Sequence, residues 1–186
     1  MSVLVMTMIQ TPTATCYELR PARPDDEIFL LQVYASTRAD EMAIVPWSAE
    51  QKIEFVQMQF NAQRQSYTEQ FPRANWDIVL RGETPVGRLI VHRAEDEISL
   101  MDIALLPKYR NAGTGTALVR DLMQEANAAR KPLRLHVETF NPALRLYERL
   151  GFVQIGDAGI YIKMEWTPAD ESEAGSTQHA LPNQSS

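Results

Sequence analysis

One strand–loop–helix segment constrains the fold of this chain more than any other part of the sequence. Residues 103–115 read Ile-Ala-Leu-Leu-Pro-Lys-Tyr-Arg-Asn-Ala-Gly-Thr-Gly. An apolar strand runs into a proline, a short basic loop with glycines follows, and a helix begins at about Thr114. This order aims backbone N–H groups and a helix N-terminus at one point, which suits an anionic phosphate ligand.

Two other interpretations of this segment remain open from its residues alone. Short glycine patterns also occur in plain strand–turn–helix connections, where glycine only makes the turn tight. A dinucleotide-binding fingerprint is the second alternative, because Glu138 follows one strand later. That fingerprint fits poorly, since Leu118 stands at the third glycine position and Pro107–Ala112 lengthens a turn that should be tight.

Composition narrows the class of protein. The 186 residues predict one domain, and 45% apolar residues are enough for a core. The net charge of −6 argues against nucleic acid as a partner. Cys16 is the only cysteine, which fits a reducing, cytoplasmic compartment. No apolar run approaches the roughly 18 residues of a membrane span, so we expect no membrane partner.

Secondary-structure signals predict an α/β (α+β) domain with the element order β-α-α-β-β-β-α-β-α-β-β. Residues 1–15 are expected to form a flexible extension, residues 16–166 the folded domain, and residues 167–186 a disordered acidic and polar tail. The expected strands cover residues 17–20, 76–80, 86–91, 98–106, 133–137, 152–155 and 160–164. The expected helices begin near Pro24, Ser48, Thr114 and Asn141.

A second motif lies near the end of the domain and reads Asn-Pro-Ala-Leu-Arg-Leu-Tyr-Glu-Arg-Leu-Gly-Phe over residues 141–152. Asn141 is a good helix cap, and Pro142 suits the first helical position because its missing N–H is not needed there. Gly151 is expected to end the helix in a left-handed conformation. Periodicity alone places Tyr147 in the core as an aromatic residue of an amphipathic helix.

The two motifs and the element order together resemble the GNAT superfamily of acetyl-CoA-dependent N-acetyltransferases over most of residues 17–166. The family loop reads Arg/Gln-x-x-Gly-x-Gly/Ala, and here it is Arg110–Gly115, with Asn111 where glycine is usual. The second motif looks like the family's Asn-x-x-Ala-x-x-Leu-Tyr-x-x-x-Gly-Phe signature, in closely similar spacing. The resemblance implies a single GNAT-like domain whose mixed, mostly antiparallel sheet of about six or seven strands has helices on both faces.

The resemblance also implies the donor half of a reaction. Acetyl-CoA would be the co-substrate, with no metal. Backbone N–H groups of the loop would bind its pyrophosphate, and the strand before the loop would run beside its pantetheine arm. The implied cofactor-binding residues are Ala104, Leu105, Leu106, Arg110, Asn111, Ala112, Gly113, Thr114, Gly115, Thr116, Asn141 and Tyr147.

For catalysis, the resemblance implies that Tyr147 is the general acid that protonates the departing thiolate. A backbone N–H of the strand before the loop would stabilise the oxyanion, and we expect it to be that of Leu105. Asp102 or Glu138 is the possible general base, although each could be only a salt-bridged strand residue and a water chain could replace it. We treat His136, which shares a strand face with Glu138, as structural.

The acceptor is the less constrained half. The connection between the first two helices, residues 38–47, would line the acceptor site, with Met42 and Trp47 as an apolar wall and Asp40 and Glu41 attracting a cationic amine. A small-molecule amine and a protein amine both remain open, as does a homodimer. The glutamine-rich helix from Gln51 either packs in such a dimer or covers the acceptor site. A non-catalytic acyl-CoA-binding or sensing module is the alternative function.

Overall fold

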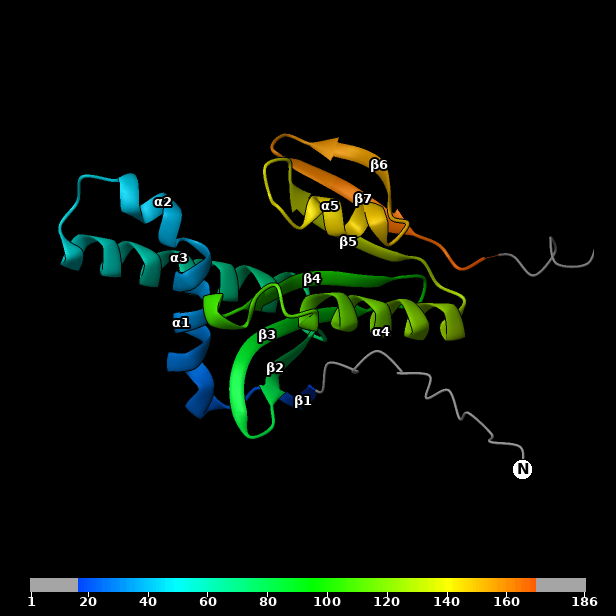
Figure 1. Ribbon diagram of the computed structural model, residues 1–186, viewed down its shortest axis with the longest axis horizontal. Helices are drawn as coiled ribbons and strands as arrows, with labels where there is room; N and C mark the ends of the chain where they lie inside the picture. Colours follow the sequence, from blue (N-terminus) through cyan, green and yellow to red (C-terminus); the bar gives the residue numbers. More distant parts are fainter. Residues whose placement is uncertain (1–16, 170–186) are drawn as a thin grey trace, which may run out of the picture.

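The computed structural model describes residues 17–169, in which seven strands form one twisted sheet (Figure 1). Their order across the sheet is β1-β2-β3-β4-β5-β7-β6. All neighbouring pairs are antiparallel except β4 and β5. The strands are β1 (Glu18–Pro21), β2 (Asn75–Arg81), β3 (Thr84–Arg93), β4 (Ile98–Leu105), β5 (Leu133–Glu138), β6 (Val153–Ala158) and β7 (Tyr161–Trp166).

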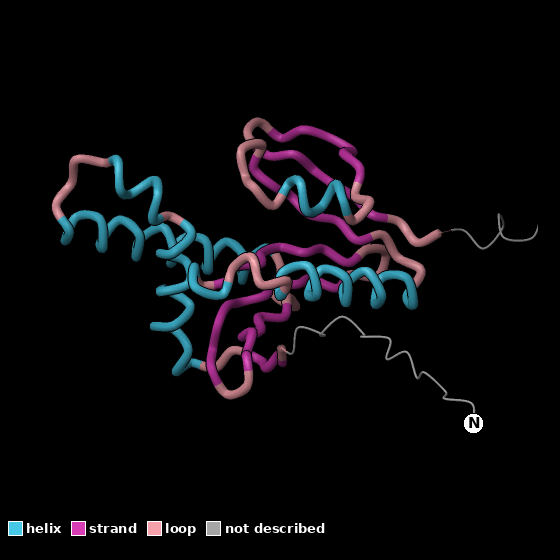
Figure 2. The backbone as a smooth tube through the Cα atoms, viewed as in Figure 1, coloured by secondary structure: helices cyan, strands magenta, loops and turns pink. Residues whose placement is uncertain are grey.

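Helices lie on both faces of the sheet, and Figure 2 shows how they flank the strands. The α-helices are α1 (Glu27–Thr37), α2 (Ala39–Ile44), α3 (Ala49–Gln70), α4 (Thr114–Ala129) and α5 (Leu144–Arg149), with short 3-10 turns at η1 (Pro24–Asp26) and η2 (Pro107–Tyr109). The expected start of α3 is confirmed: Ser48 Oγ accepts a hydrogen bond from Gln51 N, and the Gln51 side chain accepts one from Ser48 N at 2.9 Å.

Two apolar clusters hold these layers together, one on each face. Leu118 and Val119 of α4 pack with strand residues such as Val79 and with Tyr147 of α5. Ile78, next to Val79 but on the opposite face, packs under α1 and α3 against residues such as Phe60. The expected single mixed sheet with helices on both faces is therefore confirmed.

Strands β4 and β5 part at the centre of the sheet. Within residues 17–169, their parallel pairing covers only Ile98–Leu100 against Leu133–Leu135, although both strands continue further. Met101 is an extra residue in β4, because Ile90 of β3 pairs with Asp102 while Val91 pairs with Leu100. A bulge of this kind bends its strand. Beyond it, β4 and β5 leave a wedge between the two halves of the sheet.

Some local expectations were wrong. The connection between the first two long helices holds a further helix, α2, because its residues have good helix propensity. The last helix begins at Leu144 rather than at Asn141, since residues 142–143 form a turn.

The expected extension at residues 1–15 and most of the expected acidic tail at residues 167–186 lie outside the described residues. Searched over the described range, the helices include none that is long and apolar enough to cross a membrane.

Candidate active site

The loop between β4 and α4 presents backbone rather than side chains. Asn111 and Gly113 both adopt left-handed conformations, with φ of 60° and 84°. Gly113 precedes the first residue of α4, and no side chain of residues 17–169 caps that helix. The first N–H groups of a helix have no partner within the helix. This 16-residue helix therefore directs uncapped N–H groups and the positive end of its dipole at the loop.

The loop has room for a ligand at its centre. A Cβ atom added to Gly115 would meet nothing within 4 Å. Gly115 is thus not packed against the protein, and its space is open beside the uncapped end of α4. The left-handed residues, the open space and the free N–H groups fit the pyrophosphate of coenzyme A.

The Arg110 side chain connects three segments. Its Nε donates to the carbonyl oxygen of Leu105 at 2.8 Å, at the end of β4. Its Nη2 donates to the carbonyl oxygen and Oγ of Ser36 in α1, at 3.1 and 3.2 Å. The side chain therefore fixes the loop to the strand before it and to α1.

Backbone alternation at the end of β4 determines where Leu105 points. The N–H of Leu106 donates to the carbonyl oxygen of Val86 in β3 at 2.9 Å. Successive residues of a strand direct their polar groups to opposite edges. The N–H and carbonyl of Leu105 therefore face the edge away from β3, where β4 and β5 part.

The wedge between β4 and β5 opens into a cleft of about 550 Å³. It contains several residues that the sequence singled out, namely Glu41, Gln63, Asp102, His136, Glu138, Asn141 and Tyr147. Met42 and Trp47 are not among its lining residues: Met42 packs against the cluster under α1 and α3, and Trp47 contacts Phe55 edge to face at 5.1 Å. The loop of residues 110–116 lies outside the cleft lining as well.

Tyr147 comes from α5 and is only 5% exposed, with its ring 5.6 Å from that of Phe152. Burial, and secondarily the negative charge of Asp102, raises the pKa of this phenol to about 12. Its hydroxyl forms no hydrogen bond to any residue in the range 17–169, although it lines the cleft. Asn141 lies beside it and caps the turn before α5, because its Oδ1 accepts from Ala143 N at 2.9 Å.

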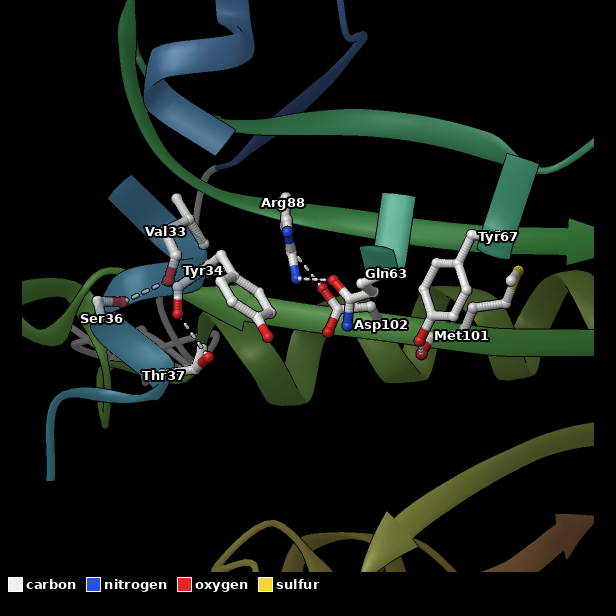
Figure 3. Close-up of polar contacts among 9 residues, drawn as sticks. All are labelled: Val33, Tyr34, Ser36, Thr37, Gln63, Tyr67, Arg88, Met101 and Asp102. Atoms are coloured by element: carbon white, nitrogen blue, oxygen red, sulfur yellow. Dashed lines mark hydrogen bonds and ion pairs between the residues drawn. The ribbon is translucent and has the colours of Figure 1, made fainter. Parts of the chain in front are cut away.

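A buried arginine stands behind Asp102 (Figure 3). Arg88 extends from β3 and is 1% exposed. Its Nε donates to Asp102 Oδ2 at 2.6 Å, and its Nη2 donates to Gln63 Oε1 of α3 at 3.1 Å. The guanidinium also lies 5.5 Å from the ring centre of Tyr34. Asp102 is therefore held as the partner of a buried charge.

Glu138 is held less firmly. Its Oε1 lies 3.9 Å from Arg38 Nη1, while the same arginine nitrogen lies 2.9 Å from Glu41 Oε1. The side chain of Glu138 is 19% exposed and faces the cleft. The two carboxylates that the sequence suggested as the general base thus lie in one cleft, and Asp102 is held by a shorter ion pair than Glu138.

Tyr67 of α3 is a second phenol in the cleft. Burial, with a smaller contribution from Asp102, raises its pKa to about 12. Its hydroxyl donates to the carbonyl oxygen of Met101 at 3.4 Å, at the bulge of β4. Tyr67 therefore contacts the residue at which β4 turns away from β5.

Sequence reasoning missed several lining residues, namely Tyr34, Tyr67, Arg88, Tyr161 and Lys163, whereas Arg38 lies in the connection that was expected to line the acceptor site. One of them carried a signal. Arg88 is the single charged residue in the run Val86–Val91, which is otherwise apolar or glycine. A charge inside a buried strand requires a partner, so this arginine already indicated a polar site on that face.

Comparison with known proteins assigns this architecture. The profile of the acetyltransferase (GNAT) family matches residues 36–152. No curated protein sequence matches the chain. Among solved structures, PaiA N-acetyltransferase from Thermoplasma acidophilum, in complex with coenzyme A, is 18% identical, with a TM-score of 0.63 over 82% of this chain and 99% of that one. The ribosomal-protein-S18-alanine N-acetyltransferase of Escherichia coli is 21% identical, with a TM-score of 0.56 over 89% of this chain and 100% of that one.

These structural likenesses show a shared fold, and the family profile covers well over half of the chain. The chain belongs to the acetyltransferase (GNAT) family and is an acyltransferase.

Proposed function

We propose that this acyltransferase transfers an acetyl group from acetyl-CoA to a primary amine, with both substrates bound at once. The observation that carries the proposal is the placement of Tyr147. It lies buried at the cleft formed where β4 and β5 part, and its hydroxyl has no hydrogen-bond partner among residues 17–169. The uncapped N-terminus of α4 supplies an anion site at the end of the same strand β4. The solved structure of PaiA N-acetyltransferase with coenzyme A is consistent with such a donor.

When bound, acetyl-CoA supplies a thioester whose carbonyl carbon accepts the amine nitrogen while its carbon–sulfur bond breaks. Tyr147 holds a proton at its hydroxyl for the leaving thiolate. A phenol whose pKa is raised to about 12 remains protonated at neutral pH, so the proton is present in every molecule. The N–H of Leu105 faces the parting edge of β4, where it would donate to the oxygen on which negative charge develops.

The attacking nitrogen also gives up a proton, and we assign it to Glu138 in preference to Asp102. Asp102 already accepts a hydrogen bond from buried Arg88 at 2.6 Å, so its Oδ2 is occupied. Glu138 has only the longer 3.9 Å approach to Arg38. A carboxylate with fewer donors is the freer proton acceptor.

The test is the rate of thiol release from acetyl-CoA over a broad panel of amines, compared between wild type and Tyr147→Phe. We expect kcat to fall by roughly 10²- to 10⁴-fold, the usual contribution of a positioned acid. The dissociation constant for coenzyme A should change much less than kcat, because Tyr147 would contribute one contact whereas the backbone of the loop would bind the pyrophosphate.

Tyr67→Phe is the matched comparison, since it removes a second phenol with a similarly raised pKa from the same cleft. Its kcat should fall much less than that of Tyr147→Phe. Equal losses in the two variants would contradict the assignment of Tyr147 as the acid. Tight binding of acetyl-CoA without turnover of any amine would instead favour a non-catalytic acyl-CoA-binding role.

A further inference from the structure

The carboxylates of the cleft are already engaged by arginines. Four acidic side chains line it, and each lies within ion-pair distance of a guanidinium. These pairs are Glu41 and Glu138 with Arg38, Asp102 with Arg88, and Glu97 with Arg134. Arg134 also pairs with Glu165 at 2.6 Å. A second ammonium group on an acceptor would therefore have to displace an arginine to find an anion.

One cation of the cleft lacks such a partner. Lys163 of β7 lines the cleft and forms no ion pair with any residue from 17 to 169. It contributes only a minor, longer-range attraction that helps to lower the pKa of Glu97. The register of the sheet places it beside His136 of β5, with both side chains on the face that borders the cleft.

Arg88 adds a buried donor on the other wall. Its Nη1 has no hydrogen-bond partner within the described residues, although the side chain is 2% exposed. Because this nitrogen is buried, an acceptor in the cleft would not reach it, so Lys163 is the donor open to a ligand. Lys163 is thus a donor without an ion-pair partner among residues 17–169. Glu41, Asp102 and Glu97 are already paired, and only Glu138, at 3.9 Å from Arg38, is left as the proton acceptor.

From these pairings we infer that the amine acceptor also carries a carboxylate, and that Lys163 binds this carboxylate at the end of the cleft formed by β5 and β7. This inference rests on the proposed acetyl transfer and narrows its acceptor class. It disfavours linear polyamines and aminoglycoside-like amines, whose further ammonium groups would meet arginine-bound acids and a free lysine.

The spacing along β5 indicates the size of the acceptor. Glu138, the assigned proton acceptor, pairs with Tyr161, and His136 pairs with Lys163 two residues away. Two strand residues span about 7 Å. An extended dipeptide spans a similar distance from its amine to its carboxylate, at about 3.3–3.6 Å per residue. A short peptide or an acidic amino acid therefore fits better than glycine.

The test measures kcat/KM for acceptor pairs that differ only in the carboxylate. Glycylglycine is compared with glycylglycinamide, and glutamate with glutamine, which lacks only the side-chain carboxylate, with spermidine as the polycation. We expect the member of each pair that has the additional carboxylate to be favoured at least tenfold, through KM more than through kcat, and spermidine to be the poorest acceptor.

Three variants locate the effect. Lys163→Gln should remove the preference for glycylglycine over its amide, and Lys163→Arg should restore most of it. Lys52→Gln is the matched control, because Lys52 lies on α3, is also half-buried and does not line the cleft. That variant should retain the wild-type preference. Calorimetric titration with coenzyme A measures the affinity of the donor site in each protein, independently of the acceptor.

If the amides or spermidine are acetylated as well as the acids are, the proposed acceptor class is wrong, although the proposed acetyl transfer still holds. A preference for acids that survives in Lys163→Gln would overturn the role of Lys163 alone. If coenzyme A binds but no amine in either set is acetylated, the proposed function fails, and the acceptor class fails with it.

Discussion

The donor loop and the acceptor cleft are built in opposite ways. The loop is contiguous and acts through its backbone: left-handed residues at Asn111 and Gly113 aim N–H groups at one spot. The cleft is assembled from side chains of α1, α2, α3, α5, β3, β4, β5 and β7, with the ion pair of buried Arg88 at its wall. The loop needs only permissive residues and an open space, whereas the cleft needs charges to be matched in the interior.

Because of this difference, substitutions in the loop and in the cleft should have different effects on ligand binding and on stability. Residues of the loop make few contacts with the core, so changes there should alter ligand binding and leave folding nearly intact. Residues of the cleft support one another electrostatically, so changes there should alter folding and acceptor binding together. The following experiments are chosen to break or to refine that contrast.

Arg88→Met should have the most severe effect on folding. The change leaves Asp102 beside a buried methionine, without the guanidinium 2.6 Å away. Removing one partner of a buried ion pair typically costs about 3–5 kcal/mol. Urea denaturation followed by circular dichroism measures this loss. Arg64→Met is the control, because its pair with Glu27 is about half exposed and should contribute less than about 1 kcal/mol. Similar losses in the two variants would mean that the cleft does not depend on its buried charge.

Gly115→Asp should have a large effect on the donor side and almost none on folding. A new side chain there meets no protein atom within 4 Å, so the fold can hold it. Its negative charge would oppose the phosphates at the N-terminus of α4, and we expect coenzyme A to bind at least about 100-fold more weakly.

Gly115→Asn, of nearly the same shape but neutral, separates charge from bulk and should lose much less affinity. Calorimetry gives the affinities, and thermal unfolding should show Tm values close to wild type for both variants. Unchanged affinity for coenzyme A in Gly115→Asp would exclude this loop as the phosphate site.

The same contrast explains which parts were predictable from the sequence. The loop and the order of elements along the chain follow from local signals, since a glycine, a helix start and an apolar run are read over a few adjacent residues. The cleft does not, because Arg88, Gln63 and Lys163 come from β3, α3 and β7, which are far apart in the sequence and meet only in the folded domain. Helix α2 was missed because its six residues carry no cap signal, and the bulge at Met101 has no signature in an apolar strand.

Alkaline unfolding tests the two buried phenols of the cleft. The pKa values of Tyr67 and Tyr147 are raised to about 12, against about 10 in an unfolded chain. Between these values the unfolded chain binds fewer protons than the folded protein, so the free energy of unfolding falls as pH rises from 10 to 12. Tyr67→Phe and Tyr147→Phe should each make this fall shallower, by about 1–2 kcal/mol. Denaturation at a series of pH values measures it, and a slope as steep as wild type in the double variant would contradict the role of these phenols.

Arg110 connects the donor loop with the acceptor cleft, and its removal should change the free energy of unfolding less than the substitutions above. Its guanidinium bonds the end of β4 at Leu105 and the last turn of α1 at Ser36, which is followed by the cleft residues Thr37 and Arg38. Arg110→Gln should cost about 1 kcal/mol, because these hydrogen bonds are exposed. Ser36→Ala removes only the Oγ contact, so a double-mutant cycle should give a coupling of about 0.5 kcal/mol.

Measuring the acceptor KM in the same variants is more informative than measuring their stability. If Arg110 only stabilises the loop, its loss weakens coenzyme A binding and leaves the acceptor KM unchanged. If it also positions α1, the acceptor KM rises in Arg110→Gln even at saturating acetyl-CoA, and Ser36→Ala shows the same change to a smaller degree. We expect the second result, because the contacts to Ser36 are on the acceptor side of the loop. An acceptor KM equal to wild type in both variants would show that the donor loop and the acceptor cleft are independent.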